Sequence, residues 1–121
     1  MEASKTKPVY DLEERTFLFA KNIRSILKKI SKNLLNEDGL KQLIRASGSV
    51  GANYIEANEA LSKKDFHFRI KIYRKEAKES SFWIRLLIES SLIKFKDELT
   101  KLFNESIELK KIFSTICEKS K

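Results

Sequence analysis

Four stretches of the sequence repeat apolar residues at intervals of three and four positions, and no other feature constrains the fold as strongly. This spacing places an apolar stripe along each of four helices, and a helix of this kind is stable only when its stripe is covered. No segment alternates with a period of two. The sequence therefore predicts an all-α protein. The stretches run from Asp11 to about Ser31, from Asn36 to Leu61, from Ser62 to Ser91 and from Leu99 to Ile116.

The predicted connections between these helices are short. Asn36 or Asp38 can cap the second helix, and Ser62 with Asp65 forms a capping box at the start of the third. Short turns place consecutive helices side by side and antiparallel. We therefore predict an up-down-up-down, antiparallel four-helix bundle with left-handed packing.

The length of the chain, 121 residues, is that of one domain. We expect this domain to span residues 11–118 and residues 1–10 to form a disordered tail. Cys117 is the only cysteine, so no disulfide framework is expected, and neither a signal peptide nor a membrane-spanning run is visible. The sequence therefore indicates a soluble, cytoplasmic protein without a membrane partner.

Small residues cluster within the second helical stretch. Glycine weakens a helix by up to roughly 1 kcal/mol relative to alanine, so such a cluster indicates close packing against a neighbouring helix. The third stretch also carries a second apolar stripe beside its main one, which is more apolar surface than one protomer needs. The second stripe favours self-association. The residues predicted to form close helix packing or an oligomer interface are Ser47, Gly48, Gly51, Ala52, Phe68 and Trp83.

Basic residues outnumber acidic ones, with 25 Lys and Arg against 17 Asp and Glu and a formal net charge of +8. Such an excess favours polyanionic partners. One stripe of cations follows the first helix, and the third helix carries a second group. These cations can contact the phosphates of RNA or DNA, or can form an ordinary solvated face. The predicted phosphate-contacting residues are Lys21, Arg24, Lys28, Lys32, Lys71, Arg74 and Lys78.

Four glutamates are the candidates for a metal site. Glu56 and Glu59 would face Glu76 and Glu79 across a helical hairpin. Helical carboxylate metal sites normally add a histidine three residues after a glutamate, and none of these four has one. We therefore expect the carboxylates to pair with arginine or lysine and predict no metal.

A catalytic arrangement is not predicted either. The only histidine, His67, and Cys117 have no spacing that would bring them together. Gly48 and Gly51 lack the preceding strand and the Gly-Lys-Ser ending of a phosphate-binding loop. We predict a non-enzymatic protein with no catalytic residues and no cofactor.

Two segments carry residues at fixed spacing, RASGSVGANYIEANEALSKKDF over residues 45–66 and RKEAKESSFW over residues 74–83. The pattern resembles the bacterial 23S rRNA intervening-sequence protein family. This resemblance implies a four-helix protomer that assembles into a homopentamer. A related group, the accessory proteins of diversity-generating retroelements, is similar in fold and works with a reverse transcriptase and nucleic acid.

Two functions fit these features. The first is a homo-oligomeric accessory or scaffold protein that binds RNA or DNA, with a reverse transcriptase or other protein as a further partner. The alternative is an adaptor whose basic face recruits an acidic partner protein and binds no nucleic acid directly. No base-reading motif is visible, so nucleic-acid binding is expected to follow the backbone and to weaken steeply with salt.

Overall fold

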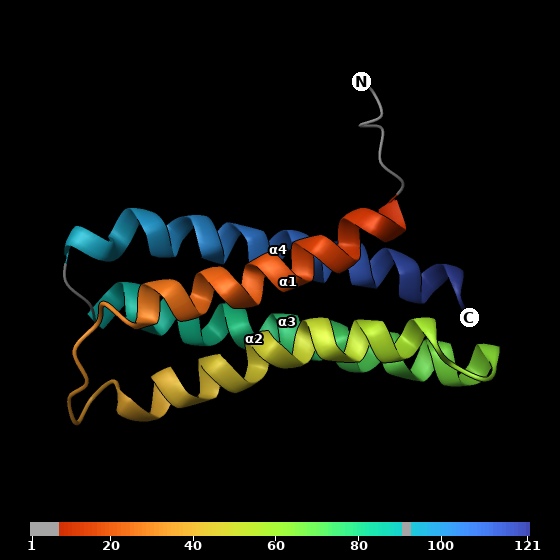
Figure 1. Cartoon of the computed structure of the whole chain (residues 1–121), viewed down its shortest axis with the longest axis horizontal. Helices are drawn as coiled ribbons and strands as arrows, with labels where there is room; N and C mark the ends of the chain where they lie inside the picture. Colours follow the sequence, from red (N-terminus) through yellow and green to blue (C-terminus); the bar gives the residue numbers. More distant parts are fainter. Residues whose placement is uncertain (1–7, 91–92) are drawn as a thin grey trace, which may run out of the picture.

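The structure, a computed structural model, describes residues 8–90 and 93–121. The chain reverses direction at each turn, and each helix lies beside the next, with α4 returning beside α1 (Figure 1). This arrangement confirms the predicted all-α, up-down-up-down, antiparallel four-helix bundle, and the described residues contain no strand. The elements are α1 (Pro8–Leu27), α2 (Glu37–Asn58), α3 (Lys63–Ser90), a short 3₁₀ helix η1 (Ile93–Phe95) and α4 (Lys96–Lys119).

The apolar stripes of the four helices meet in one core along the bundle. Burial of each large apolar side chain contributes about 1.5–3 kcal/mol, so this core is the main source of stability. Tyr54 and Tyr73 pack against Phe113, with ring centroids 6.0 Å away in each case. Burial raises the pKa of Tyr73 to about 12, so its hydroxyl stays neutral. The largest fully buried apolar side chains are Phe19, Ile23, Leu43, Val50, Ile70, Tyr73, Ile84, Leu99, Leu109 and Phe113.

Helix α1 begins earlier than the sequence predicts. Its first residue is Pro8, so residues 8–10 are helical and the prediction of a disordered tail is wrong for them. Proline is tolerated in the first turn of a helix because the backbone nitrogen there has no intrahelical partner to lose. Residues 1–7 of the predicted tail lie outside the described residues.

Helix α1 also ends earlier, at Leu27 rather than near Ser31. Two asparagines hold the turn that follows. Asn36 accepts a hydrogen bond from the backbone N–H of Asn33 at 2.8 Å and donates one to the carbonyl of Ser31 at 3.0 Å. Asn33 Oδ1 accepts from the backbone N–H groups of Leu35 and Asn36. Such side-chain bonds compete with the helix, and they use the side chain of Asn36, which makes no capping bond within the described residues.

The turn between α2 and α3 is longer than predicted. α2 ends at Asn58, so Leu61 lies in the turn and is 98% exposed. The N–H groups of Glu59 and Ala60 bond to carbonyls three residues back, which tightens the end of the helix. The predicted cap of α3 is confirmed, because Ser62 Oγ accepts a hydrogen bond from the backbone N–H of Asp65 at 3.0 Å. A cap of this kind stabilises a helix by about 1 kcal/mol.

Helices α1 and α2 approach each other closely at two glycines. A Cβ atom on Gly51 would lie 3.3 Å from Thr16 Oγ1 and 3.5 Å from the Thr16 carbonyl oxygen. A Cβ atom on Gly48 would lie 3.2 Å from the guanidinium of Arg24. At Gly51 the two nearest atoms belong to the short, buried side chain of Thr16, which yields less easily than the end of a long side chain. The missing side chain of Gly51 therefore sets how near α1 can lie to α2.

Replacing Gly51 with leucine is expected to destabilise the protein by about 1–3 kcal/mol, the usual cost of overpacking a buried contact. Leucine is the better helix former by up to about 1 kcal/mol, which offsets only part of this cost. Urea unfolding followed by far-UV circular dichroism measures the change. Ala52→Leu is the matched control, because Ala52 is the next residue and is exposed. Equal losses in the two variants would contradict the close contact with Thr16.

Candidate nucleic-acid interface

A basic groove runs between α3 and α4. All of its α3 residues are cations, and its volume is about 430 Å³. The structure therefore brings together three of the cations that the sequence assigns to phosphate binding, those at positions 71, 74 and 78. The residues that line the basic groove are Lys71, Arg74, Lys75, Lys78, Lys110 and Ser114.

The register of α3 against α4 explains why Lys110 joins this groove. Ser81 Oγ and Ser106 Oγ lie 2.7 Å apart and mark where the two helices touch. Arg74 precedes Ser81 by two helical turns, and Lys110 follows Ser106 by one turn. Because the helices are antiparallel, a step toward the start of α3 and a step toward the end of α4 lead in the same direction along the bundle. Arg74 and Lys110 therefore lie on the same side of the serine contact. Sequence analysis missed Lys110, since only the pairing of the two serines would have indicated the register.

The cations of the basic groove have no ion-pair partner among the described acidic residues. None of the five forms an ion pair within residues 8–90 and 93–121. Lys75 acts on Glu79 only at longer range, as the weakest of the influences on its pKa. Like charges three or four residues apart on a helix repel each other by a few tenths of a kcal/mol. The groove is therefore an uncompensated positive surface of the protomer.

The cations predicted on α1 do not join the basic groove. Lys21, Arg24 and Lys28 instead line a second groove, of about 520 Å³, between α1 and α2. Its other lining residues are mostly apolar or small, and they include Phe17 and Gly48. The two predicted groups of cations thus belong to different helix pairs. We call this second surface the α1–α2 groove.

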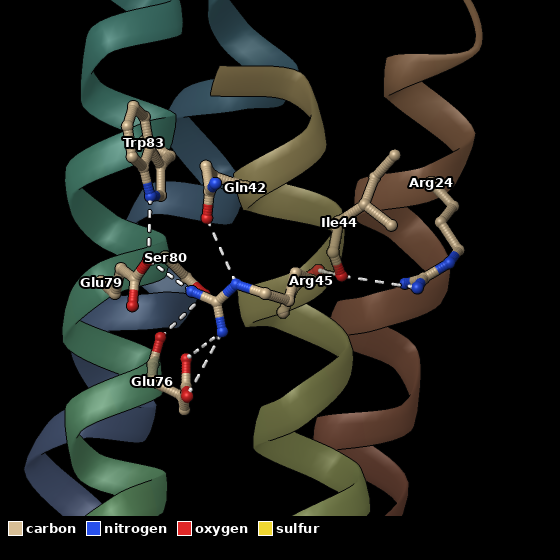
Figure 2. A network of polar contacts seen from close by, with 9 residues as sticks. Arg24, Gln42, Ile44, Arg45, Glu76, Glu79, Ser80 and Trp83 are labelled. Carbon is tan, nitrogen blue, oxygen red and sulfur yellow. Dashed lines mark hydrogen bonds and ion pairs between the residues drawn. The ribbon is translucent and has the colours of Figure 1, made fainter. Parts of the chain in front are cut away.

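Arg24 and Lys32 differ from the sequence prediction in another way. The guanidinium of Arg24 donates to the carbonyl of Ala20 at 3.3 Å and to that of Ile44 at 3.4 Å, so it connects α1 with α2 (Figure 2). Lys32 lies beyond Leu27, where α1 ends. The prediction of one helical stripe from Lys21 to Lys32 is therefore wrong, because the helix stops before the stripe is complete.

Arg45 of α2 holds two carboxylates of α3 (Figure 2). Its guanidinium donates to Glu76 at 3.3 Å and, over a shorter distance, to Glu79. Gln42 accepts a hydrogen bond from Arg45 Nε at 3.2 Å, and Trp83 Nε1 donates to Glu79 at 3.2 Å. The two sequence segments that carry the family resemblance, residues 45–66 and 74–83, thus contribute to one polar network that joins α2 to α3.

The network shifts the pKa values of its charged members. Burial raises the pKa of Glu79, but the hydrogen bonds from Arg45 and Trp83 outweigh burial and hold this pKa below its usual value. The hydrogen bond to Glu79 likewise raises the pKa of Arg45.

Trp83 also packs closely on α2, since a Cβ atom on Gly39 would lie 3.4 Å from its ring. Trp83, assigned by the sequence to close packing or an interface, contacts α2 within the protomer.

The carboxylates considered for a metal site are engaged in ion pairs. Glu56 of α2 pairs with Arg69 of α3 at 2.6 Å, while Glu76 and Glu79 pair with Arg45. The expected pairing with arginine is thereby confirmed for these three glutamates. Within the described part of the chain, no three His, Cys, Asp or Glu side chains are grouped so that they could hold a metal ion.

His67 and Cys117 do lie together, which the sequence did not predict. His67 Nε2 is 3.9 Å from Cys117 Sγ, and His67 Nδ1 is 2.8 Å from Ser120 Oγ. The contact forms because the start of α3 lies beside the end of α4, a relation that spacing within one helix does not encode. Cys117 is buried, and Ser120 Oγ donates to its carbonyl at 3.1 Å. These residues close one end of the bundle.

The remaining residues of the predicted packing set have different surroundings. Ser47 is fully buried, and its hydroxyl donates to the carbonyl of Ile44 at 3.4 Å. Ala52 and Phe68 are exposed, and Phe68 has 59% of its surface accessible. Within one protomer, therefore, Ser47 contributes to the core, whereas Ala52 and Phe68 are available to a partner.

These features define a helical bundle with a basic groove. None of the helices in the described ranges is long and apolar enough to cross a membrane. The model of the 23S rRNA-intervening sequence protein family matches residues 10–115, and the chain belongs to this family.

One similar solved structure is that of a protein of unknown function from the S23 ribosomal protein family of Bacteroides thetaiotaomicron. It is 32% identical in sequence, with a TM-score of 0.75, and the match covers 88% of this chain and 97% of the other. No curated protein matches the sequence. The comparisons therefore confirm the predicted family and fold.

Replacing Arg45 with methionine is expected to lower stability at neutral pH, because Glu76 and Glu79 lose their partner. The hydrogen bonds from Arg45 and Trp83 hold the pKa of Glu79 in the folded state below its ordinary value of 4.5. The stability that ionised Glu79 contributes to the folded state is therefore complete above this ordinary value and is lost as the pH falls through the folded-state pKa. Urea midpoints measured from neutral to acidic pH should show a difference between wild type and variant that shrinks below 4.5.

The control for this experiment is Lys41→Met. It breaks an exposed pair, Lys41 with Glu37 at 3.6 Å, and exposed pairs typically contribute under about 1 kcal/mol. Its effect should be small at every pH. A loss in Arg45→Met that does not depend on pH would contradict the assignment of Glu79 as the partner.

Proposed function

We propose that this protein binds the phosphate backbone of RNA or DNA through the basic groove, as a non-enzymatic accessory or scaffold protein. The observation that carries the proposal is the set of five cations, contributed by two helices, that form no ion pair among the described residues. A polyanion is the complement of such a surface, because each phosphate contact releases condensed counterions.

The composition of the groove indicates backbone contacts rather than base reading. Four of its five cations are lysines, which act as flexible point charges, and only Arg74 carries the planar fork that suits bidentate recognition. Contacts of this kind position a protein on nucleic acid but carry little sequence information. Membership of the 23S rRNA-intervening sequence family is compatible with such a partner. The solved relative is described as having unknown function, so the proposal rests on the groove.

We further propose that the protomers assemble into a homo-oligomer in the cytoplasm, with the homopentamer implied by the family resemblance. Large exposed apolar side chains support assembly, because surfaces of this kind usually mark interfaces. A ring would also multiply the basic groove and thereby the number of phosphate contacts. The exposed apolar side chains on α1 and α2 are Phe17, Leu18, Ile44 and Ile55.

The α1–α2 groove supports a second candidate function, the recruitment of an acidic partner protein. It combines the exposed ring of Phe17 with the cations Lys21, Arg24 and Lys28. An acidic amphipathic segment of a polymerase, a reverse transcriptase or another protein would match both properties. In this alternative the protein binds little bare RNA even at low salt.

Replacing Lys71, Arg74, Lys78 and Lys110 together with glutamine is expected to reduce RNA affinity at low salt by at least tenfold. Each lost phosphate contact should also lower the slope of log affinity against log salt by about one. Fluorescence anisotropy across a salt series measures both quantities.

A control with the same change in net charge tests whether the groove is specific. Lys41, Lys96, Lys101 and Lys119 are exposed and lie outside the basic groove, and their replacement with glutamine should leave most of the affinity intact. Equal losses in the two variants would contradict a groove-specific site. Absence of binding by wild type at low salt would overturn the proposed function and favour the adaptor.

Light scattering is expected to show particles of five times the 14.1 kDa of one chain. Replacing both Phe17 and Ile55 with glutamate should reduce the mass, because the charges would have to be buried in the interface. Retained helicity by circular dichroism would show that the protomer is still folded. A wild-type mass equal to one chain would contradict assembly.

A further inference from the structure

The basic groove has an exposed phenylalanine at each end of its α3 cations. Phe68 is 59% exposed and Phe82 is 56% exposed, and neither belongs to the buried core. Positions 68, 71, 75, 78 and 82 advance by steps of three and four residues, so they lie on one face of the helix. Along this face, three lysines lie between two phenylalanines. We call it the α3 outer stripe.

The ring of Phe82 is supported from one side. It packs edge to face with Trp83, with the ring centroids 4.9 Å apart and the planes at 78°. Trp83 is itself fixed by its hydrogen bond to Glu79, which Arg45 holds. More than half of the surface of Phe82 remains exposed to solvent. The ring is therefore a partly fixed apolar platform beside Lys78.

The dimensions of the α3 outer stripe suit a short segment of nucleic acid. Phe68 and Phe82 are 14 residues apart, which is about 21 Å at a rise of about 1.5 Å per residue. A stacked strand rises about 3.4 Å per nucleotide, so the stripe spans about six nucleotides. The three lysines between the rings lie where the phosphates of such a segment would pass.

We propose that the basic groove binds single-stranded nucleic acid, with its phosphates along the cations and with bases stacked on Phe68 and Phe82. This inference rests on the proposed function. In a duplex the faces of the bases are covered by neighbouring base pairs, whereas a single strand can turn its bases onto aromatic side chains. Every base has a flat face, so stacking adds affinity without adding sequence preference.

A second copy of the chain would be a poor occupant of this stripe. Lys78 precedes Phe82 by one helical turn and Arg85 follows it by three residues, and neither forms an ion pair within the described residues. Burial of Phe82 against an equally basic protein would bury these charges without partners, which is unfavourable. A nucleic acid would instead cover the ring with a base and neutralise both charges with its phosphates.

The test compares a labelled RNA of about 12 nucleotides and mixed sequence with the duplex formed by the same RNA and its complement. The double variant Phe68→Leu with Phe82→Leu keeps apolar bulk but removes both aromatic faces. It should bind the single strand about 5- to 100-fold more weakly than wild type, the loss expected for one stacked base or more, and should bind the duplex unchanged. Phe82→Trp should retain single-strand affinity.

A matched control and a mass measurement separate the possible outcomes. Leu61→Ala removes exposed apolar surface in the turn between α2 and α3, outside the basic groove, and should leave single-strand affinity unchanged. The mass of the double variant by light scattering should equal that of wild type, and a reduced mass would overturn the proposal by showing that these rings lie in an oligomer interface.

Unchanged single-strand affinity in the double variant, with binding still lost in the four-cation variant, would overturn the stacking proposal alone. Unchanged binding in the four-cation variant would contradict the proposed function itself.

Discussion

The ion pairs of Arg45 with Glu76 and Glu79 neutralise the acids of α3 that face α2. Helical spacing places these acids on one side of α3 and Lys71, Arg74 and Lys78 on another. Arg45 holds the acids on the side of α2, and the cations that remain line the groove with α4. The contact that joins α2 to α3 therefore also neutralises the acids of α3, while the cations of the basic groove face α4.

The sequence was sufficient to predict the helices and the core, because the apolar period of a helix is a local property that packing then satisfies. The predicted ends were less accurate, since they depend on which hydrogen bonds compete for the backbone. At the end of α1 the side chains of Asn33 and Asn36 bond the turn and stop the helix before Ser31. That local competition moves Lys32 out of the helical stripe to which its spacing assigned it.

The candidate site was predictable only where its residues lie on one helix. Lys71, Arg74 and Lys78 share a face by spacing alone, and the structure places all three in the basic groove. Lys110 depends on the register of α3 against α4, which the contact between Ser81 and Ser106 marks. The meeting of His67 with Cys117 has the same origin, so the contacts that sequence analysis missed are those between helices.

Within residues 8–90 and 93–121, the cations of the basic groove form no ion pair that would give them a role in the fold. Lys71 and Lys75, like Arg74 and Lys78, are like-charged pairs four residues apart, and such pairs weaken a helix slightly. An acid at one of these positions would relieve the repulsion, and elsewhere on α3 Arg69 does have acidic partners, Asp65 of α3 and Glu56 of α2. Burial does not require cations there either, because Lys71, Lys75 and Lys78 are exposed. A surface that costs stability and forms no ion pair among the described residues supports the proposal of a ligand that carries the opposite charge.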